Sequence, residues 1–329
     1  MNRAMLLNFG IVAIILPICG MLAIPARALD VTVINDVPPG HPRLKYALQI
    51  EAEVSKASGG SIRILTNRSI PGKAGLDALL TDRAQIAALN TAHLEAVDPR
   101  IGFVNLPFGL NDAAMERPGT LDRIVELMQR QLDESGLVIL GVMRGADNLF
   151  VFKDRKVRAP KDLAGVKIRV TGEGVYERIM ESLGAQPVAM PIGQIKAAIA
   201  EGKVEGMCTS PGGWTSQVGM SAPIGSQVPG LMMLTYTYVA KKSWLDSLTT
   251  EQRKIIMDAV RNASMLQWHA MYNDDKEVIE AFVKQGGSYE VVPESELGPW
   301  REKVAPVSAE FERKYPDVVK AARDILAGK

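Results

Sequence analysis

The stretch "DLAGVKIRV", residues 162–170, places an arginine where it could bind an acid. Val166, Ile168 and Val170 alternate with charged residues, which predicts a β-strand, and two glycines follow shortly after. Arg169 is therefore expected at the carboxyl end of a strand, where open α/β sheets usually bind ligands. Its planar set of donors fits a carboxylate in a bidentate pose, and an ion pair within the protein is the alternative.

Other chemical motifs in the chain are weak. His41, His93 and His269 are scattered, and no cysteine–histidine pair has metal-ligand spacing. The stretch "RVTGEGVYE" follows a predicted strand, but Glu177 stands where a dinucleotide-binding fingerprint needs its third glycine. The sequence therefore predicts neither a metal ion nor a cofactor.

Cys208 is the one candidate nucleophile that a predicted strand could present to a cleft, in "EGMCTSPGG". No Gly-x-Ser-x-Gly elbow occurs, and no histidine lies near Cys208 in the sequence. A small buried apolar residue is the simpler interpretation of this cysteine.

The first 28 residues have the form of a secretory signal peptide. A short charged start precedes an almost wholly apolar run, and "ARA" at 26–28 matches a signal-peptidase site. We expect cleavage after Ala28 and a periplasmic mature protein. An uncleaved membrane anchor is the alternative, and a lipid anchor on Cys19 is disfavoured because Ile18 occupies a position that needs a small residue.

The composition is that of an ordinary globular protein. The chain has 329 residues, of which 47% are hydrophobic and 23% charged, and its formal net charge is +1. These values exclude a disordered chain and give no sign of nucleic-acid or anionic-membrane binding. Without the signal peptide only Cys208 remains, so the fold cannot depend on an internal disulfide.

Predicted strands and helices alternate along the chain, an order typical of α/β folds with mostly parallel sheets flanked by helices. The expected strands are 30–35, 61–67, 84–90, 137–143, 148–154, 166–170, 203–210 and 231–241. The expected helices are 42–58, 74–83, one within 115–136, 175–184, 192–202 and 250–285. At about 1.5 Å per residue, the last helix would reach roughly 50 Å, more than one domain's width.

Two α/β lobes with a long helix spanning both suggest a hinged clamshell that binds its ligand in the cleft between the lobes. We expect lobe I to comprise residues 29–146 and 233–270. Lobe II is expected to comprise residues 147–232 and 271–329.

The sequence resembles the solute-binding proteins of TRAP (tripartite ATP-independent periplasmic) transporters, of the dicarboxylate-binding type. The segments "APKDLAGVKIRV" and "LGAQPVAMPIGQIKAAIAEGKVEG" look like the core signature of that family. Three further segments agree with it: "ASGGSIRI", "NLPFGLND" and "WLDSLTTEQRKIIMDAV". The resemblance spans nearly the whole mature chain.

This resemblance implies a receptor without catalytic activity. Such proteins capture a small organic acid in the periplasm and deliver it to membrane permease subunits. Arg169 takes the place of the family's carboxylate-binding arginine, and Asn90 that of a pocket-lining residue. A monomer that closes around its ligand is expected.

Two departures from the family pattern bear on the ligand. Asp147 stands where many members have a second arginine, and Thr209 stands where many have a pocket-lining asparagine. A second ligand carboxylate close to Asp147 would be repelled and costly to desolvate. The sequence therefore favours a monocarboxylate, with a hydroxyl or ammonium group near Asp147.

Further candidate ligand contacts are Trp214 and, after the first strand, Asn35 and Asp36. Phe150 and Tyr236 could add an aromatic wall. Two alternatives remain open: a periplasmic enzyme that acts on a small acid in the same cleft, through Cys208 or Asp147, and a binding protein that feeds a membrane sensor.

Overall fold

The first of two β-sheets has five strands in the order β2-β1-β3-β10-β4. The computed structural model describes residues 28–35, 37–70, 72–172 and 174–329. Only β10 runs against its neighbours β3 and β4. The strands are β1 (Leu29–Asn35), β2 (Ile62–Asn67), β3 (Ile86–Asn90), β4 (Leu137–Asp147) and β10 (Met233–Lys241).

The second sheet has six strands in the order β11-β9-β5-β8-β6-β7. Here β5 alone is antiparallel to its neighbours, so the expected mostly parallel sheets are confirmed. The strands are β5 (Leu149–Phe152), β6 (Lys167–Val170), β7 (Gln186–Ala189), β8 (Gly206–Thr209), β9 (Ile224–Gln227) and β11 (Ser288–Val291). The sequence does not predict three of these strands, β7, β9 and β11.

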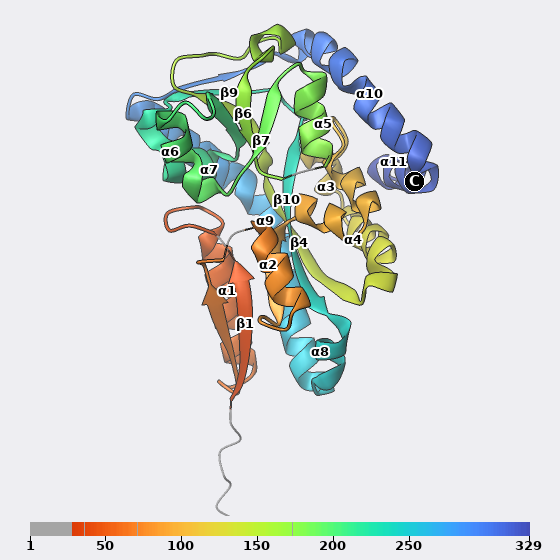
Figure 1. Ribbon diagram of the computed structural model, residues 1–329. Coiled ribbons are helices and arrows are strands. Elements are labelled where there is room, and N and C mark those ends of the chain that lie inside the picture. Colours follow the sequence, from red (N-terminus) through yellow and green to blue (C-terminus); the bar gives the residue numbers. More distant parts are fainter. Residues whose placement is uncertain (1–27, 36, 71, 173) are drawn as a thin grey trace, which may run out of the picture.

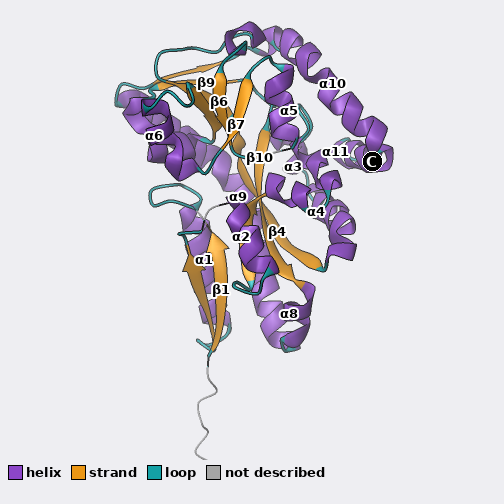
Figure 2. Ribbon diagram, viewed as in Figure 1, coloured by secondary structure: helices purple, strands orange, loops and turns teal. Residues whose placement is uncertain are grey.

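We call each sheet, with the helices packed on it, a lobe: the first lobe carries the five-stranded sheet and the second lobe the six-stranded sheet. Figure 1 shows β1 and β4 in the lower half of the molecule and β6, β7 and β9 in the upper half. The helices surround both sheets (Figure 2). They are α1 (Leu44–Ala57), α2 (Gly72–Leu80), α3 (Asp112–Met115), α4 (Thr120–Leu132), α5 (Val175–Ser182), α6 (Ile195–Ala200), α7 (Pro211–Gly213), α8 (Lys242–Ser247), α9 (Thr250–Lys284), α10 (Gly298–Lys314) and α11 (Pro316–Leu326).

The long helix α9 has 35 residues, close to its predicted length. Thr249 and Gln252 form a capping box, since each side chain accepts a hydrogen bond from the other's backbone N–H. The helix stops before Gly286, whose φ of +105° favours glycine. Because α9 packs against β4 of the first sheet and β11 of the second, it connects the two lobes as expected.

The chain crosses between the sheets at two neighbouring places. It leaves the first sheet between β4 and β5 and returns between β9 and β10. The Asn148 N–H donates to the Met232 carbonyl at 2.9 Å, which ties the two crossing segments together. Two adjacent segments and one helix are therefore the covalent connections about which the lobes can move.

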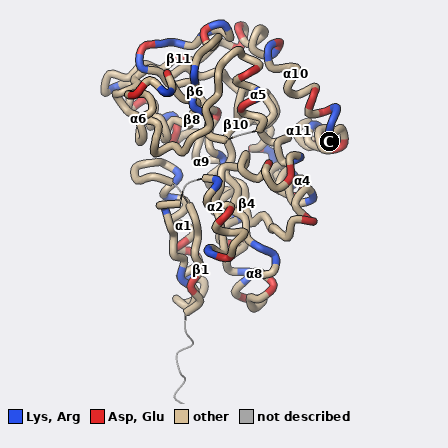
Figure 3. Tube along the Cα trace, viewed as in Figure 1, with Lys and Arg blue, Asp and Glu red and all other residues tan. Residues whose placement is uncertain are grey.

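The predicted lobe boundaries stay a prediction. The C-terminal helix α11, expected in the second lobe, packs against α4 of the first as well as against α10. Both lobes carry mixed charge over their traces, without a region of one sign (Figure 3), which agrees with the small net charge.

Candidate ligand-binding site

A cavity of about 290 Å³ lies between the lobes. Its polar lining comes from both of them: His41, Arg43, Lys73, Asn90, His93, Arg169, Thr171, Thr209, Ser210, Gln217 and Tyr236. Its apolar lining includes Ala74, Met190, Pro191, Ile192 and Leu234. A small cavity with a few convergent polar groups is the form of a small-molecule site.

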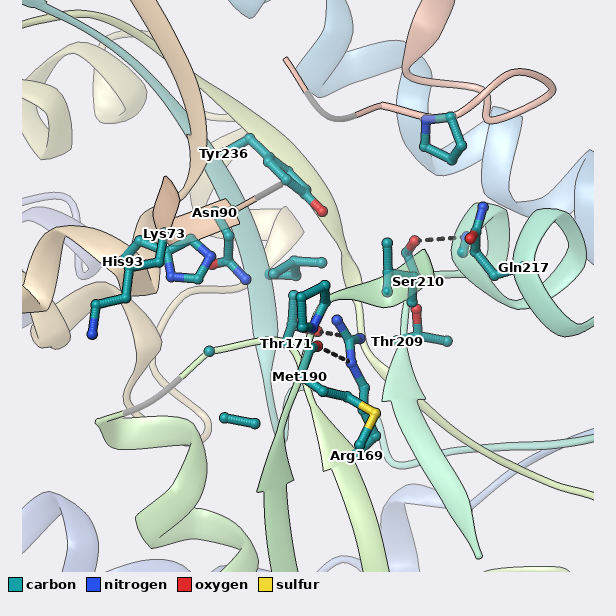
Figure 4. Close-up of a pocket in the computed structure, with 18 of the residues that line it drawn as sticks. Lys73, Asn90, His93, Arg169, Thr171, Met190, Thr209, Ser210, Gln217 and Tyr236 are labelled. Carbon is teal, nitrogen blue, oxygen red and sulfur yellow. Dashed lines mark hydrogen bonds between the residues drawn. The ribbon is translucent and has the colours of Figure 1, made fainter. Parts of the chain in front are cut away.

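Arg169 reaches this cavity from β6, as its strand-end position predicted. Its side chain is 2% exposed. Nε donates to the Met190 carbonyl at 3.0 Å and Nη1 donates to Thr171 Oγ1 at 3.2 Å (Figure 4). These two bonds hold the guanidinium plane against the cavity wall, so little side-chain entropy remains to be lost when an anion binds.

Asn90 lies at the end of β3 in the opposite wall. Its Oδ1 accepts the Ala92 N–H at 3.0 Å, which fixes the amide so that Nδ2 is the other end. The side chain is 4% exposed, and Nδ2 is buried with no hydrogen-bond partner among the described residues. Because Asn90 lines the cavity, this amide presents donors there that a bound acceptor would satisfy (Figure 4).

The register of β10 explains the rest of the first-lobe wall. Tyr236 pairs with Asn90 across the ladder, and Leu234, two residues earlier, lines the same cavity. Thr235 between them faces away and donates to Thr91 Oγ1 at 2.8 Å. This alternation is the two-residue period of a strand.

Arg43 is a second buried arginine at the cavity, which sequence analysis missed. Its Cζ lies 3.1 Å from the centroid of the Tyr236 ring, a cation–π contact that positions the side chain against the first-lobe wall. It precedes α1 at its N-terminus, in a segment predicted to be helix from about residue 42. The available signal was the Pro/Gly-rich segment 38–43, which contains His41 and Arg43 and follows a strand's carboxyl end, where ligands usually bind.

The charge of the lining favours an anion. Arg43, Lys73 and Arg169 are basic, and no aspartate or glutamate belongs to the lining among the described residues. A cleft lined by charge of one sign concentrates ligands of the opposite sign.

Thr209 lines the cavity as predicted, whereas Asp147 does not. Asp147 is the last residue of β4, which extends four residues beyond its predicted end because it stays paired with β10. Its Oδ2 accepts the Gly230 N–H at 2.8 Å, and its Oδ1 is buried with no partner among the described residues. Asp147 therefore lies in the crossing segments between the lobes and not beside the cavity.

Burial raises the pKa of Asp147 to about 7, partly offset by the Gly230 N–H and by Arg144. In the unfolded chain this carboxyl has a pKa of 3.8. At pH values between 3.8 and about 7, the folded protein therefore keeps a proton on Asp147 that the unfolded chain has lost. Its contribution to the free energy of unfolding is present below pH 4 and is lost as the pH rises through 7.

Asp147→Asn removes this titration and keeps an oxygen for the Gly230 N–H. Relative to the wild type, this variant should gain about 2 kcal/mol in free energy of unfolding between pH 5 and pH 8. Urea denaturation at both pH values measures the difference. Asp154→Asn, at an exposed aspartate just after β5, is the matched control and should show no such gain. If the free energy of unfolding changed equally between pH 5 and pH 8 in both variants, Asp147 would not have a raised pKa in the folded protein.

Trp214 is a core residue rather than a wall of the cavity. It is fully buried, its indole N–H donates to the Ala222 carbonyl at 2.8 Å, and its ring packs edge-on against Phe282. Phe150 is likewise in the core, stacked on Trp300. A large aromatic ring is driven into the interior of the second lobe because burying its area is more favourable than leaving it at a wet cleft.

Asn35 is also kept away from the cavity. Its Nδ2 donates to the Tyr238 hydroxyl at 3.1 Å and its Oδ1 accepts the Val37 N–H at 3.3 Å, so it stabilises the turn after β1. Asp36, the other candidate there, lies outside the described residues.

Cys208 is buried in β8, where it pairs with Phe150 of β5. Burial raises the pKa of its thiol, so the thiolate that a nucleophile needs is disfavoured. In the part of the chain that the structure describes, no group of three or more potential ligands could hold a metal ion. Within the same residues, no helix combines the length and the apolar character needed to cross a membrane.

A family model described as "Bacterial extracellular solute-binding protein, family 7" matches residues 34–314. The chain is 21% identical to a solute-binding protein of Chromohalobacter salexigens, over 88% of this chain and 87% of that protein. It is 22% identical to the C4-dicarboxylate-binding periplasmic protein DctP of Rhodobacter capsulatus, over 93% of this chain and 94% of that protein.

Solved structures share the fold at low sequence identity. A sugar acid binding protein of Advenella mimigardefordensis, in complex with galactonate, has a TM-score of 0.84 at 19% identity, covering 92% of this chain and 99% of its own. A Bordetella pertussis solute receptor that binds pyroglutamic acid has a TM-score of 0.82 at 20% identity, covering 91% of this chain and 100% of its own. A Shewanella oneidensis TRAP periplasmic solute binding protein with bound succinate has a TM-score of 0.82 at 20% identity, covering 91% of this chain and 99% of its own.

Proposed function

Because this chain belongs to the bacterial extracellular solute-binding proteins of family 7, we propose that it captures a small organic acid and passes it to TRAP membrane subunits. Its support includes a relative described as a C4-dicarboxylate-binding periplasmic protein, and structural neighbours described as a receptor that binds pyroglutamic acid and as a sugar acid binding protein. The proposed action is closure of the two lobes around the acid, without catalysis.

The observation that carries the proposal is the fixed guanidinium of Arg169 in a cavity with a basic lining. A carboxylate is the ligand group that matches a planar arginine with two parallel donors. Asn90 adds buried amide donors from the other lobe, so an acid oxygen between the walls can be bound from both sides.

The structure does not support the reason for which the sequence favoured a monocarboxylate. It rested on Asp147 facing the ligand, and Asp147 lies in the crossing segments instead. The neighbours are described with galactonate and pyroglutamic acid, which carry one carboxylate, and with succinate, which carries two. We propose a small acid with one carboxylate on Arg169 and further oxygen acceptors along the cavity.

A screen of the exported protein against named acids tests this function. Succinate, D-galactonate, D-glucuronate and L-pyroglutamate are each added in excess, with succinamide as an uncharged comparison. At one hundred times its dissociation constant, a bound acid adds about 2.7 kcal/mol to stability and raises the unfolding temperature. Stabilisation by succinamide as strong as by succinate would contradict carboxylate recognition.

The competing enzyme hypothesis predicts turnover of the bound acid. The buried Cys208 and the position of Asp147 give it no accessible nucleophile or base at the cavity from the two residues on which it rested. Mass spectrometry of the acid recovered after prolonged incubation distinguishes the two: a receptor returns it unchanged and in a stoichiometric amount.

Export by a cleaved signal peptide remains part of this proposal. Residues 1–27 lie outside the described residues, and β1 begins at Leu29, immediately after the expected cleavage site. N-terminal sequencing of the exported protein should therefore begin at Leu29.

Replacing Asn90 should weaken acid binding because the ligand loses the hydrogen-bond donors of the Asn90 amide. Asn90→Ala leaves a ligand oxygen without its donor and should lower the affinity about tenfold. Asn90→Asp should lower it further, because a carboxylate would then face the ligand's own. Titration calorimetry with the best acid of the screen measures both; tighter binding by Asn90→Asp than by Asn90→Ala would show that the amide faces away from the ligand.

A further inference from the structure

One hydrogen bond joins the two lobes directly across the cavity. His41 lies in the segment between β1 and α1 of the first lobe, and Ser210 follows β8 of the second. The distance between His41 Nε2 and Ser210 Oγ is 3.2 Å, and both residues are buried and line the cavity. Figure 4 shows Ser210 at the edge of this cavity, close to Thr209 and Gln217.

The direction of this bond follows from the other ring nitrogen. His41 Nδ1 lies 3.1 Å from the backbone nitrogen of Arg43 and accepts its N–H, so Nδ1 carries no proton. The pKa of His41 is lowered to about 3 by burial and by the nearby charge of Arg43, so the ring is neutral at pH 7. A neutral ring has its one hydrogen on Nε2, and His41 therefore donates to Ser210.

The Ser210 hydroxyl can therefore act only as a donor toward a further partner. Its Oγ accepts the His41 hydrogen and also the Gly213 N–H at 3.1 Å. A hydroxyl oxygen has two lone pairs, and both are used by these bonds. The hydroxyl's own hydrogen then has to find an acceptor, and Ser210 lines the cavity in which a ligand would supply one.

We infer that His41 and Ser210 form a relay across the cleft that places an acceptor oxygen of the ligand on the Ser210 hydroxyl. The matching chemical groups are a carboxylate, a carbonyl and the lone pair of a hydroxyl or ether, whereas an ammonium group has no lone pair to offer. Recognition of this oxygen is coupled to closure, because only contact between the lobes brings His41 to Ser210. The inference rests on the proposed function in that the ligand occupies this cavity.

A double-mutant cycle tests the coupling. Affinities of His41→Phe, Ser210→Ala and the double variant are measured by calorimetry with the best binder among succinate, D-galactonate, D-glucuronate and L-pyroglutamate. Each single variant should bind about tenfold more weakly, and the double variant should bind no more weakly than the worse single one. His41→Gln, whose amide can still donate to Ser210, should recover most of the loss.

Two outcomes of the cycle would overturn the relay: losses that multiply in the double variant, or a Ser210→Ala variant that binds like the wild type. Thr215→Ala is the matched control, since Thr215 carries a hydroxyl just after α7 that bonds only to the Pro211 and Gly212 carbonyls. It should bind the acid like the wild type.

Nitrogen-15 NMR of the histidine rings tests the tautomer on which the relay depends without any ligand, and so separates it from the proposed function. Without a ligand His41 should show the Nε2–H tautomer at pH 7, because the Arg43 N–H that fixes it lies in the same lobe. With the acid bound and the lobes in contact, the His41 Nε2 resonance should shift in Ser210→Ala. An Nδ1–H tautomer, or a resonance indifferent to Ser210→Ala, would overturn the relay. If Arg169→Ala retains full affinity while the cycle still shows coupling, the carboxylate site fails and the relay stands.

Discussion

Arg169→Ala is expected to weaken acid binding by roughly a hundredfold or more, because truncating one partner of a buried charge pair costs about 2–5 kcal/mol. The ligand carboxylate would remain in a cavity that has lost its fixed guanidinium, and Met190 would lose the donor to its carbonyl. Calorimetry with the best acid of the screen measures the affinity. Thermal unfolding of the ligand-free variant shows whether the fold survives.

Two further substitutions make this result specific. Arg169→Lys keeps the positive charge but loses the planar pair of donors, so it should recover only part of the affinity. Arg155→Ala removes a partly exposed arginine of the same lobe, whose ion pair with Glu205 lies at the surface, and should bind the acid normally. If Arg169→Ala and Arg155→Ala bind equally well, Arg169 does not hold the ligand.

Gly212→Ala is the second substitution with a large expected effect, and it acts on closure rather than on the ligand. A Cβ at Gly212 would lie 2.7 Å from Pro42 Cδ and 2.8 Å from His41 Nε2, both in the opposite lobe. Relief of such an overlap costs about 1–3 kcal/mol and is needed only when the lobes are in contact. The open form is then favoured, and affinity should fall by about ten- to a hundredfold.

Gly193→Ala is the matched control for this steric effect, because a Cβ at Gly193 would meet nothing within 4 Å. Affinity is measured by calorimetry, and small-angle scattering reports whether the lobes stay apart in the presence of the acid. Gly212→Ala should show a larger radius of gyration than Gly193→Ala with the same ligand. Equal affinities for the two variants would mean that the His41–Pro42 contact plays no part in closure.

Local patterns of the sequence predicted most of the elements that position the site. The alternation around Arg169 predicted the short strand β6, and the paired glycines at 286–287 predicted the end of α9 to within one residue. Such signals succeed because strand alternation and helix capping depend on residues a few positions apart. The strands β7, β9 and β11 were missed because each is only four residues long and is stabilised by pairing with another segment of the chain.

Three of the candidate residues lie at or next to the carboxyl end of a strand and line the cavity. These are Asn90, Arg169 and Thr209, and the structure brings them together from three strands. Their contacts with a ligand remain predictions, which the substitutions above test. Asp147 and Trp214 do not line the cavity: β4 continues to pair beyond its expected end, and the Trp214 ring is buried in the second lobe.

The sequence by itself determined the α/β order of elements, the long helix and the arginine at the end of β6, because each depends on local spacing. Only the tertiary structure decided which other groups meet that arginine. His41 and Ser210 are 169 residues apart, and no local pattern can specify a contact that chain crossing and lobe packing create. Asp147 illustrates the same limit, since its partner Gly230 reaches it only through the return of the chain into β10.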